Sequence, residues 1–351
     1  MSIFNNDTYK RSHELAKKEV AGRMIGKKSA LIKDINLEGV RNNINFILES
    51  FVINHKDKLI KEIISQTAVE IIPFGSFNSE ICYPPNEPPF ILLDSGTLDF
   101  LGNNFSIGYA LTSDQHDFSE QQILDYLFSS AFIYFEASEE WESRRDAIFT
   151  PKLNYSDLHK DLRIHAQNDT ISFLIFILLH EFSHLYVDKC NYKEINIWDK
   201  LAEEYNLEGF SNFSKQREES VTDITAIDLL LYFTTHCLPK KEMAISILSA
   251  IDVGFIFLAF FQSAFPKEKV GKFIRVNEYL DHPAAFQRHH VFRSLVTEKM
   301  KIFIEHKGFN YTKAGDLCQD KLFYYSEAIR NGARPSQDFY ERRELAKYLF
   351  D

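Results

Sequence analysis

Apolar side chains recur every three or four residues along most of this chain, which is the spacing of one helix face. This periodicity predicts a single helix over 37–65, and Asn6 is placed to cap an earlier helix. Ser119 and Gln122 form the S-x-x-Q pattern of a capping box, which predicts a helix over 120–146. Helices therefore dominate the expected fold.

One part of the chain lacks this helical spacing, because its apolar runs are short and rich in β-branched residues. These runs, 69–72 and 90–93, predict strands, and the prolines of 84–89 predict a loop between them. An exposed edge strand here would accept an extended peptide by β-augmentation, and an ordinary structural hairpin is the alternative. We expect a mostly helical α+β protein, in which a helical segment over 1–66 packs on a domain over 67–351, with a single domain as the alternative.

Two apolar segments of the chain are long, and the second of them raises the question of a membrane. The first, 171–188, follows a polar stretch over 151–169 that predicts a surface loop or a lid. The second, 243–265, has Asp252 in its middle, and a charge is costly in lipid. We interpret the second segment as a buried core helix, with a membrane span as the alternative.

The first apolar segment carries candidate chemistry at its end, where His180, Glu181 and His184 form the pattern H-E-x-x-H. Positions four apart lie on one helix face, so the two imidazoles can bind one metal ion, and Zn²⁺ commonly takes such ligands. Glu181 leaves the helix at a different angle and is the candidate general base for a water molecule. The alternative is a helix whose histidines and glutamate are solvated or hydrogen-bonded.

A third metal ligand is expected downstream, because a catalytic zinc ion needs three protein ligands and an open position. Glu219 and Asp223 share one face of an amphipathic helix predicted over 216–227. In this arrangement Glu219 would bind the metal, while Asp223 would accept a hydrogen bond from a ligand imidazole, that of His180. The alternative for this pair is the solvated acidic start of a helix.

The order H-E-F-S-H (180–184) and E-S-V-T-D (219–223) resembles the gluzincin metallopeptidases, a group with zincin-like domains and one zinc ion on two histidines and a glutamate. Two further pieces are similar to the M48 peptidase family. One is Asp281-His282-Pro283 with Arg288 beyond it, and the other is Asn78 with a following strand that ends in Ser95-Gly96-Thr97-Leu98. The phage-exclusion proteases of the Lit type have a similar layout.

The resemblance implies roles for three more residues. His282 would donate a hydrogen bond to an oxyanion during peptide attack, with a backbone-bonding residue at a helix start as the alternative. Asn78 and Arg288 would bind substrate, although Arg288 or Arg293 would alternatively anchor acidic groups nearby.

Composition narrows the class of protein. The 351 residues carry 40 basic and 50 acidic side chains, and a net charge of −10 argues against nucleic acid as a partner. The four cysteines lack the C-x-x-C spacing of a zinc ribbon, and the first residues lack an apolar signal region, so we expect a cytoplasmic protein.

Together these features predict a zinc-dependent endopeptidase with Glu181 as general base and a protein or peptide as substrate. Two alternatives remain: a regulator that keeps the metallopeptidase scaffold only to bind a partner, and a membrane-associated protease. The Lit-like layout adds bacterial stress or phage defence as a possible setting, by analogy alone.

Overall fold

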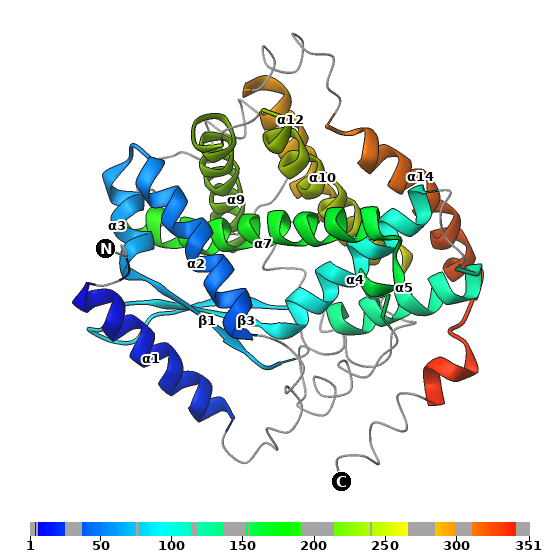
Figure 1. Ribbon diagram of the computed structural model, residues 1–351, viewed down its shortest axis with the longest axis horizontal. Helices are drawn as coiled ribbons and strands as arrows, with labels where there is room; N and C mark the ends of the chain where they lie inside the picture. Colours follow the sequence, from blue (N-terminus) through cyan, green and yellow to red (C-terminus); the bar gives the residue numbers. More distant parts are fainter. Residues whose placement is uncertain are drawn as a thin grey trace.

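The computed structural model describes the chain in eleven stretches. They are 4, 6–24, 37–74, 77–113, 118–135, 152–153, 155–190, 214–238, 241–265, 285–299 and 311–341. Within them the protein is mostly helical and has one three-stranded sheet (Figure 1). The content of helices and strands confirms the predicted class, mostly helical α+β.

The sheet consists of β1 (Ala68–Ile72), β2 (Ser79–Cys82) and β3 (Phe90–Asp94) in the order β1-β3-β2. β1 runs parallel to β3, whereas β2 is antiparallel to β3 and forms an edge. β1 and β3 are buried along their whole length, and β2 is only half-buried. Both predicted strands are therefore confirmed, and an edge strand is present.

The strand does not extend through residues 95–98, contrary to the prediction. These residues begin helix α4 (Ser95–Thr112). The hydroxyl of Ser95 and the backbone N–H of Gly96 both donate to the carbonyl of Phe74, at 3.0 and 2.7 Å. These two bonds turn the chain away from the sheet directly after Asp94.

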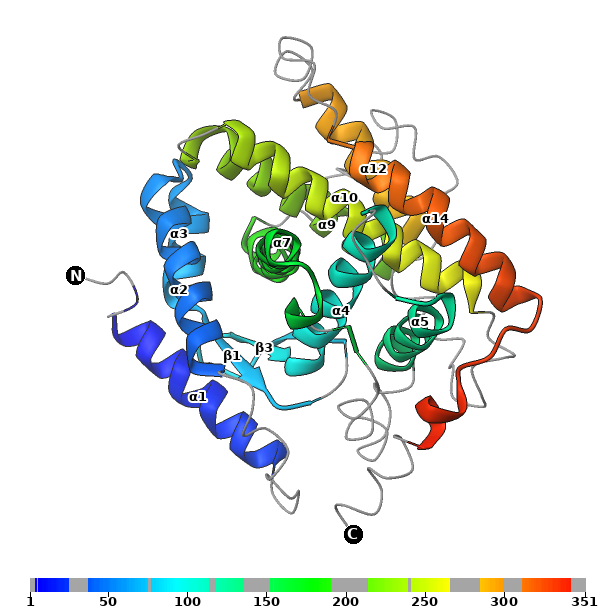
Figure 2. The same ribbon diagram turned by 45° about the vertical axis from the view of Figure 1, so that its right-hand side comes forward.

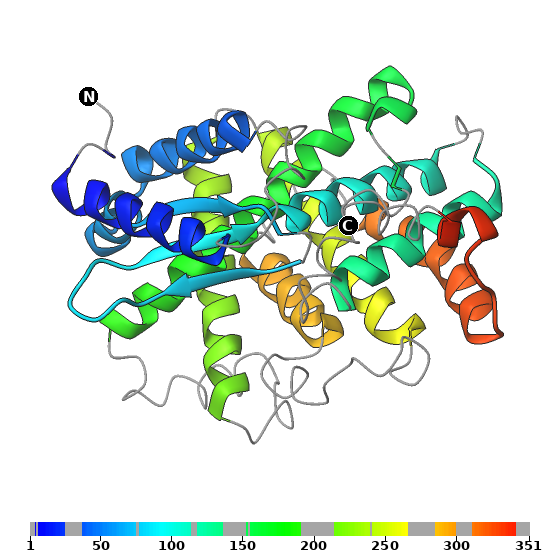
Figure 3. The ribbon, with the colours of Figure 1, turned by 90° about the horizontal axis from the view of Figure 1, so that it is seen from below.

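Helix α1 (Asp7–Arg23) covers one face of the sheet (Figure 3). The side chain of Asn6 caps it by accepting from the backbone N–H of Tyr9, as predicted. Ala16 is fully buried against Phe90 and Leu92 of β3. The small side chain lets the helix approach the strands closely.

The predicted helix over 37–65 is wrong in one respect, because the structure contains two helices. They are α2 (Leu37–Asn54) and α3 (Lys58–Gln66). Asp57 lies between them, and its carboxylate accepts from the backbone N–H of Leu59 at 2.8 Å. A side chain that caps a new helix start competes with continuation of the old helix, which accounts for the break.

Helix α7 (Lys160–Lys189) passes through the middle of the molecule, and Figure 2 views it nearly along its axis. It contacts α3, α4 and β2, and also α9 (Ser214–Tyr232) and α10 (Lys241–Ala264). Because α7 already begins at Lys160, the prediction of a loop over 151–169 is wrong for most of that stretch. The first turns of α7 project beyond the core, so their polar side chains are exposed and hide the helical periodicity.

The remaining described helices pack around this centre. They are α5 (Glu120–Phe135), the 3-10 turn Tyr155–Asp157, the π turn Phe233–Cys237, α12 (Ala285–Lys299) and α14 (Lys313–Arg330). The capping box of α5 is confirmed, since Ser119 N–H donates to Gln122 and Gln122 N–H donates to Ser119. Residues 136–146 of that prediction lie outside the described residues.

Helix α7 and residues Glu242–Ala264 of α10 are both long and apolar enough to cross a bilayer. In each, most of the apolar window is buried inside the protein, 72% in α7 and 78% in α10. The carboxylate of Asp252 in α10 is fully buried and binds Arg293 and His289. A helix whose apolar side chains are mostly buried and whose charge is paired inside the protein is typical of a protein core.

Candidate metal centre

The last turns of α7 bring two imidazoles to one face of the helix. His180 is buried and His184 is partly buried, and their ring centroids lie 4.9 Å apart. No residue in this part of α7 disturbs the helix, so the four-residue spacing alone sets the two rings side by side. The predicted shared face is confirmed.

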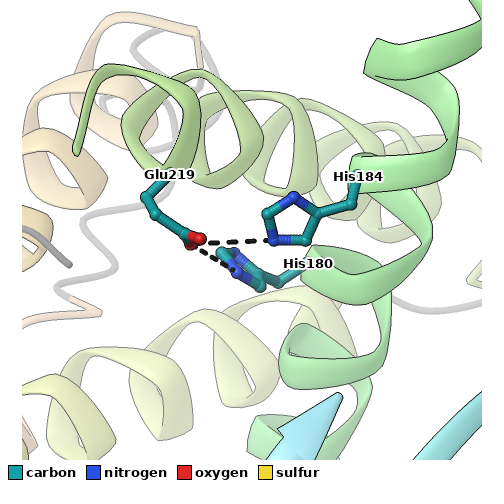
Figure 4. A group of neighbouring side chains, drawn as sticks. All are labelled: His180, His184 and Glu219. Carbon is teal, nitrogen blue, oxygen red and sulfur yellow. Dashed lines mark ion pairs between the residues drawn. The ribbon is translucent and has the colours of Figure 1, made fainter. Parts of the chain in front are cut away.

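Glu219 of α9 approaches the two imidazoles from the opposite side (Figure 4). Its Oε2 lies 3.3 Å from His180 Nε2 and 3.6 Å from His184 Nε2. One ligand atom from each of the three residues lies within 4.8 Å of the other two. The tertiary fold thus joins residues that are 35 or more positions apart, as predicted.

Hydrogen bonds on the far side of each ring direct Nε2 toward this meeting point. His180 Nδ1 donates to Asp223 Oδ1 at 2.8 Å, which is the contact predicted for Asp223. His184 Nδ1 lies 3.4 Å from the hydroxyl of Thr222, whose own proton is donated to the Glu218 carbonyl. A carboxylate and an engaged hydroxyl both act as acceptors, so each Nδ1 holds a proton and each Nε2 is left for a ligand.

The surroundings of His180 favour a positive charge. Burial alone would lower the pKa of His180, but hydrogen bonds to Asp223 and Glu219 raise the pKa to about 10. The same network acts on Asp223, because the charge of Arg288 and the bond from His180 outweigh burial and lower its pKa. A proton or a metal ion supplies the positive charge that this cluster requires.

The three donor atoms lie close enough together to hold a metal ion. Donors about 2.0–2.1 Å from a tetrahedral zinc ion lie about 3.3 Å apart, close to the distances from Glu219 Oε2 to the two Nε2 atoms. Glu219 is buried, and both Nε2 atoms face its Oε2. Two histidine nitrogens and one carboxylate oxygen are ligands that zinc takes in catalytic sites.

Arg288 of α12 lies behind the cluster rather than facing a substrate. Its Nε and one terminal nitrogen donate to the two carboxylate oxygens of Asp223, both at 2.7 Å. The side chain is 20% exposed, and that of Asp223 only 4%. These contacts correspond to the anchoring role that the sequence left open, and they give no support to the substrate-binding role.

We expect Arg288→Lys to weaken zinc binding by about 10–100-fold, the range typical of groups that orient a metal ligand. Lysine keeps the charge but cannot make two parallel bonds to Asp223, so the orientation of His180 loosens. Zinc affinity measured by competition with a chromogenic chelator tests this expectation. The matched control is Arg293→Lys, because Arg293 makes the same kind of paired contact on the same helix, with Asp252 instead. Equal zinc affinity in the two variants would contradict the assignment.

Tyr83 is a site residue that sequence reasoning did not single out. It follows β2, its side chain is largely exposed, and its hydroxyl donates to Asp188 at the end of α7 at 3.3 Å. Partial burial and the negative charges of Asp188, Glu181 and Glu218 raise the pKa of Tyr83. The edge strand therefore ends beside the last turn of α7, the helix that carries Glu181. No motif marks Tyr83, because its position depends on the packing of β2 against α7.

The two other predicted site residues have different outcomes. Asn78 is exposed, and its described bonds are made by its backbone, which pairs with Thr97 and Asp94. Its substrate-binding role stays a prediction. His282 lies outside the described residues, so its role as an oxyanion donor also stays a prediction.

Comparison of the chain with models of protein families, with curated proteins and with solved structures finds no match. The interpretation of the site therefore depends on its own geometry.

Proposed function

We propose that this protein is a zinc-dependent endopeptidase. The observation that carries the proposal is the convergence of His180 Nε2, His184 Nε2 and Glu219 Oε2, with each imidazole oriented from behind. Solvated histidines do not need orienting acceptors, whereas histidines that bind a metal usually have one on the other ring nitrogen. The set of groups matches what hydrolysis with a bound metal requires.

Each residue of the site has a separate role in the proposed reaction. When bound, Zn²⁺ would activate a water molecule and polarise the scissile carbonyl. Glu181, buried next to His180, takes the proton of the attacking water and passes it to the leaving amine. Asp223 keeps His180 in the tautomer that presents Nε2, and Arg288 keeps Asp223 ionised.

The edge strand supports a peptide as the substrate. β2 lies at one edge of the sheet, is half-buried and contacts α7. An extended peptide pairing with such an edge binds mainly through its backbone, which places successive peptide bonds along the strand. Tyr83 directly follows β2 and bonds to Asp188 of α7, the helix that carries Glu181, so the scissile bond belongs near this end.

The test is metal content and metal-dependent cleavage. Protein purified without chelator is expected to contain one zinc ion per chain and to cleave members of a mixed peptide library. 1,10-Phenanthroline should abolish cleavage, and added zinc should restore it. A folded protein that takes up no zinc would show that the cluster is structural, whereas a zinc-loaded protein that leaves every peptide intact would exclude the endopeptidase.

A further inference from the structure

A second site lies in a cavity of about 580 Å³ between α10, α12 and α14, away from the metal cluster. Figure 2 shows these three helices side by side at one flank of the molecule. The lining residues recur at helical spacing on α10 and α14, so the cavity follows the groove between the helices. Its volume is in the range of pockets that hold small organic ligands.

The middle of the cavity is apolar. Ala259 and Phe260 of α10 and Leu322 of α14 form its floor. Phe286 and Phe323 lie at its rim and are 64% and 65% exposed. Exposed aromatic rings beside an apolar groove gain free energy when an apolar group covers them.

One end of the cavity is polar and positively charged. Ser326 is only 5% exposed, and its hydroxyl makes no hydrogen bond with any part of the chain that the structure describes. Arg330 lies one turn further along α14, donates to the carbonyl of Ser263 at 3.3 Å and pairs with Glu327 at 2.9 Å. Both side chains of the pair with Glu327 are about half exposed, so water screens the pair and it contributes little.

The opposite wall is rigid. His289 lines the cavity, and its Nε2 is held at 2.7 Å by the buried carboxylate of Asp252. Arg293 binds the same carboxylate through two nitrogens and also Asp316 of α14. This network joins all three helices, so the groove is formed before any ligand arrives, which lowers the entropic cost of binding.

We propose that this cavity binds a small amphipathic carboxylic acid. Its hydrocarbon part lies over Ala259, Phe260 and Leu322, and its carboxylate meets the hydroxyl of Ser326 and the guanidinium of Arg330. The assignment follows from three complementary features: an apolar floor, the hydroxyl of a buried serine that lines the cavity and a cation one turn away. The site shares only helix α12 with the metal centre, where His289 lies next to Arg288.

Decanoate is the probe, and binding to the full-length, zinc-loaded protein is measured by titration calorimetry below the micelle concentration. We expect one site per chain, with affinity rising about three- to fourfold for each methylene between octanoate and decanoate. Arg330→Gln should weaken decanoate binding by about tenfold and leave decanol binding unchanged, because only the acid uses the charge. Arg334→Gln is the matched control, since Arg334 is exposed nearby and does not line the cavity.

A second variant, Ala259→Trp, fills the cavity and should abolish decanoate binding while zinc content and helix content stay at wild-type values. Decanoate affinity that is unchanged in Ala259→Trp, or equal for acid and alcohol in the wild type, would overturn the proposal. So would a concentration-dependent dimer, seen by sedimentation and lost in Ala259→Trp, without decanoate binding, which would assign the groove to a second copy. None of these measurements uses peptidase activity. The binding result can therefore be interpreted even if the protein cleaves no peptide.

Discussion

Glu181→Gln is expected to lower kcat for peptide cleavage by about 10²–10⁴-fold, the contribution typical of a general base. Glutamine has nearly the same shape as glutamate, but its amide cannot take a proton from water at neutral pH. The histidines, Glu219 and Asp223 are untouched, so the variant should still bind one zinc ion per chain. Loss of turnover with retained metal separates proton transfer from metal binding.

The measurement is kcat on a peptide found in the library digest, together with zinc content by elemental analysis. Glu242→Gln is the matched control, because Glu242 is an exposed residue in the first turn of α10, and its variant should retain full activity. Wild-type turnover in zinc-loaded Glu181→Gln would eliminate Glu181 as the base. Loss of zinc together with activity would instead show that Glu181 supports the metal site.

Glu219→Ala is expected to weaken zinc binding by more than about 100-fold, because even residues that only orient a metal ligand contribute 10–100-fold. The variant removes the single carboxylate that faces both Nε2 atoms. Since a metal that binds only the folded state raises stability, zinc should raise the unfolding temperature of the wild type and have little effect on Glu219→Ala.

Thermal unfolding with and without zinc measures this difference. Glu218→Ala serves as the control, because Glu218 precedes Glu219 on α9 but is not among the three clustered residues. An equal zinc-induced shift in wild type and Glu219→Ala would rule out Glu219 as a ligand. A shift that is lost in both variants would point to a general loss of acidic charge around the site.

The sequence by itself determined the parts of the site that depend on neighbours along the chain. His180, Glu181 and His184 are placed by helical spacing, and so are Glu219 and Asp223 on their own helix. The caps at Asn6 and Ser119 were readable for the same reason, because a cap bonds to a backbone group only three residues away. Local geometry of this kind varies little with the rest of the fold.

Only the tertiary structure decided which distant groups meet. Arg288 reaches Asp223 over 65 positions, and Tyr83 reaches Asp188 over 105. The early start of α7 likewise depended on how far α7 projects beyond the core. The break before α3 is different, because Asp57 bonds to a backbone group only two residues away and the apolar spacing concealed this local signal. Hydrophobic burial places whole helices and strands against one another, and residue spacing within one element carries no information about the partner it will contact.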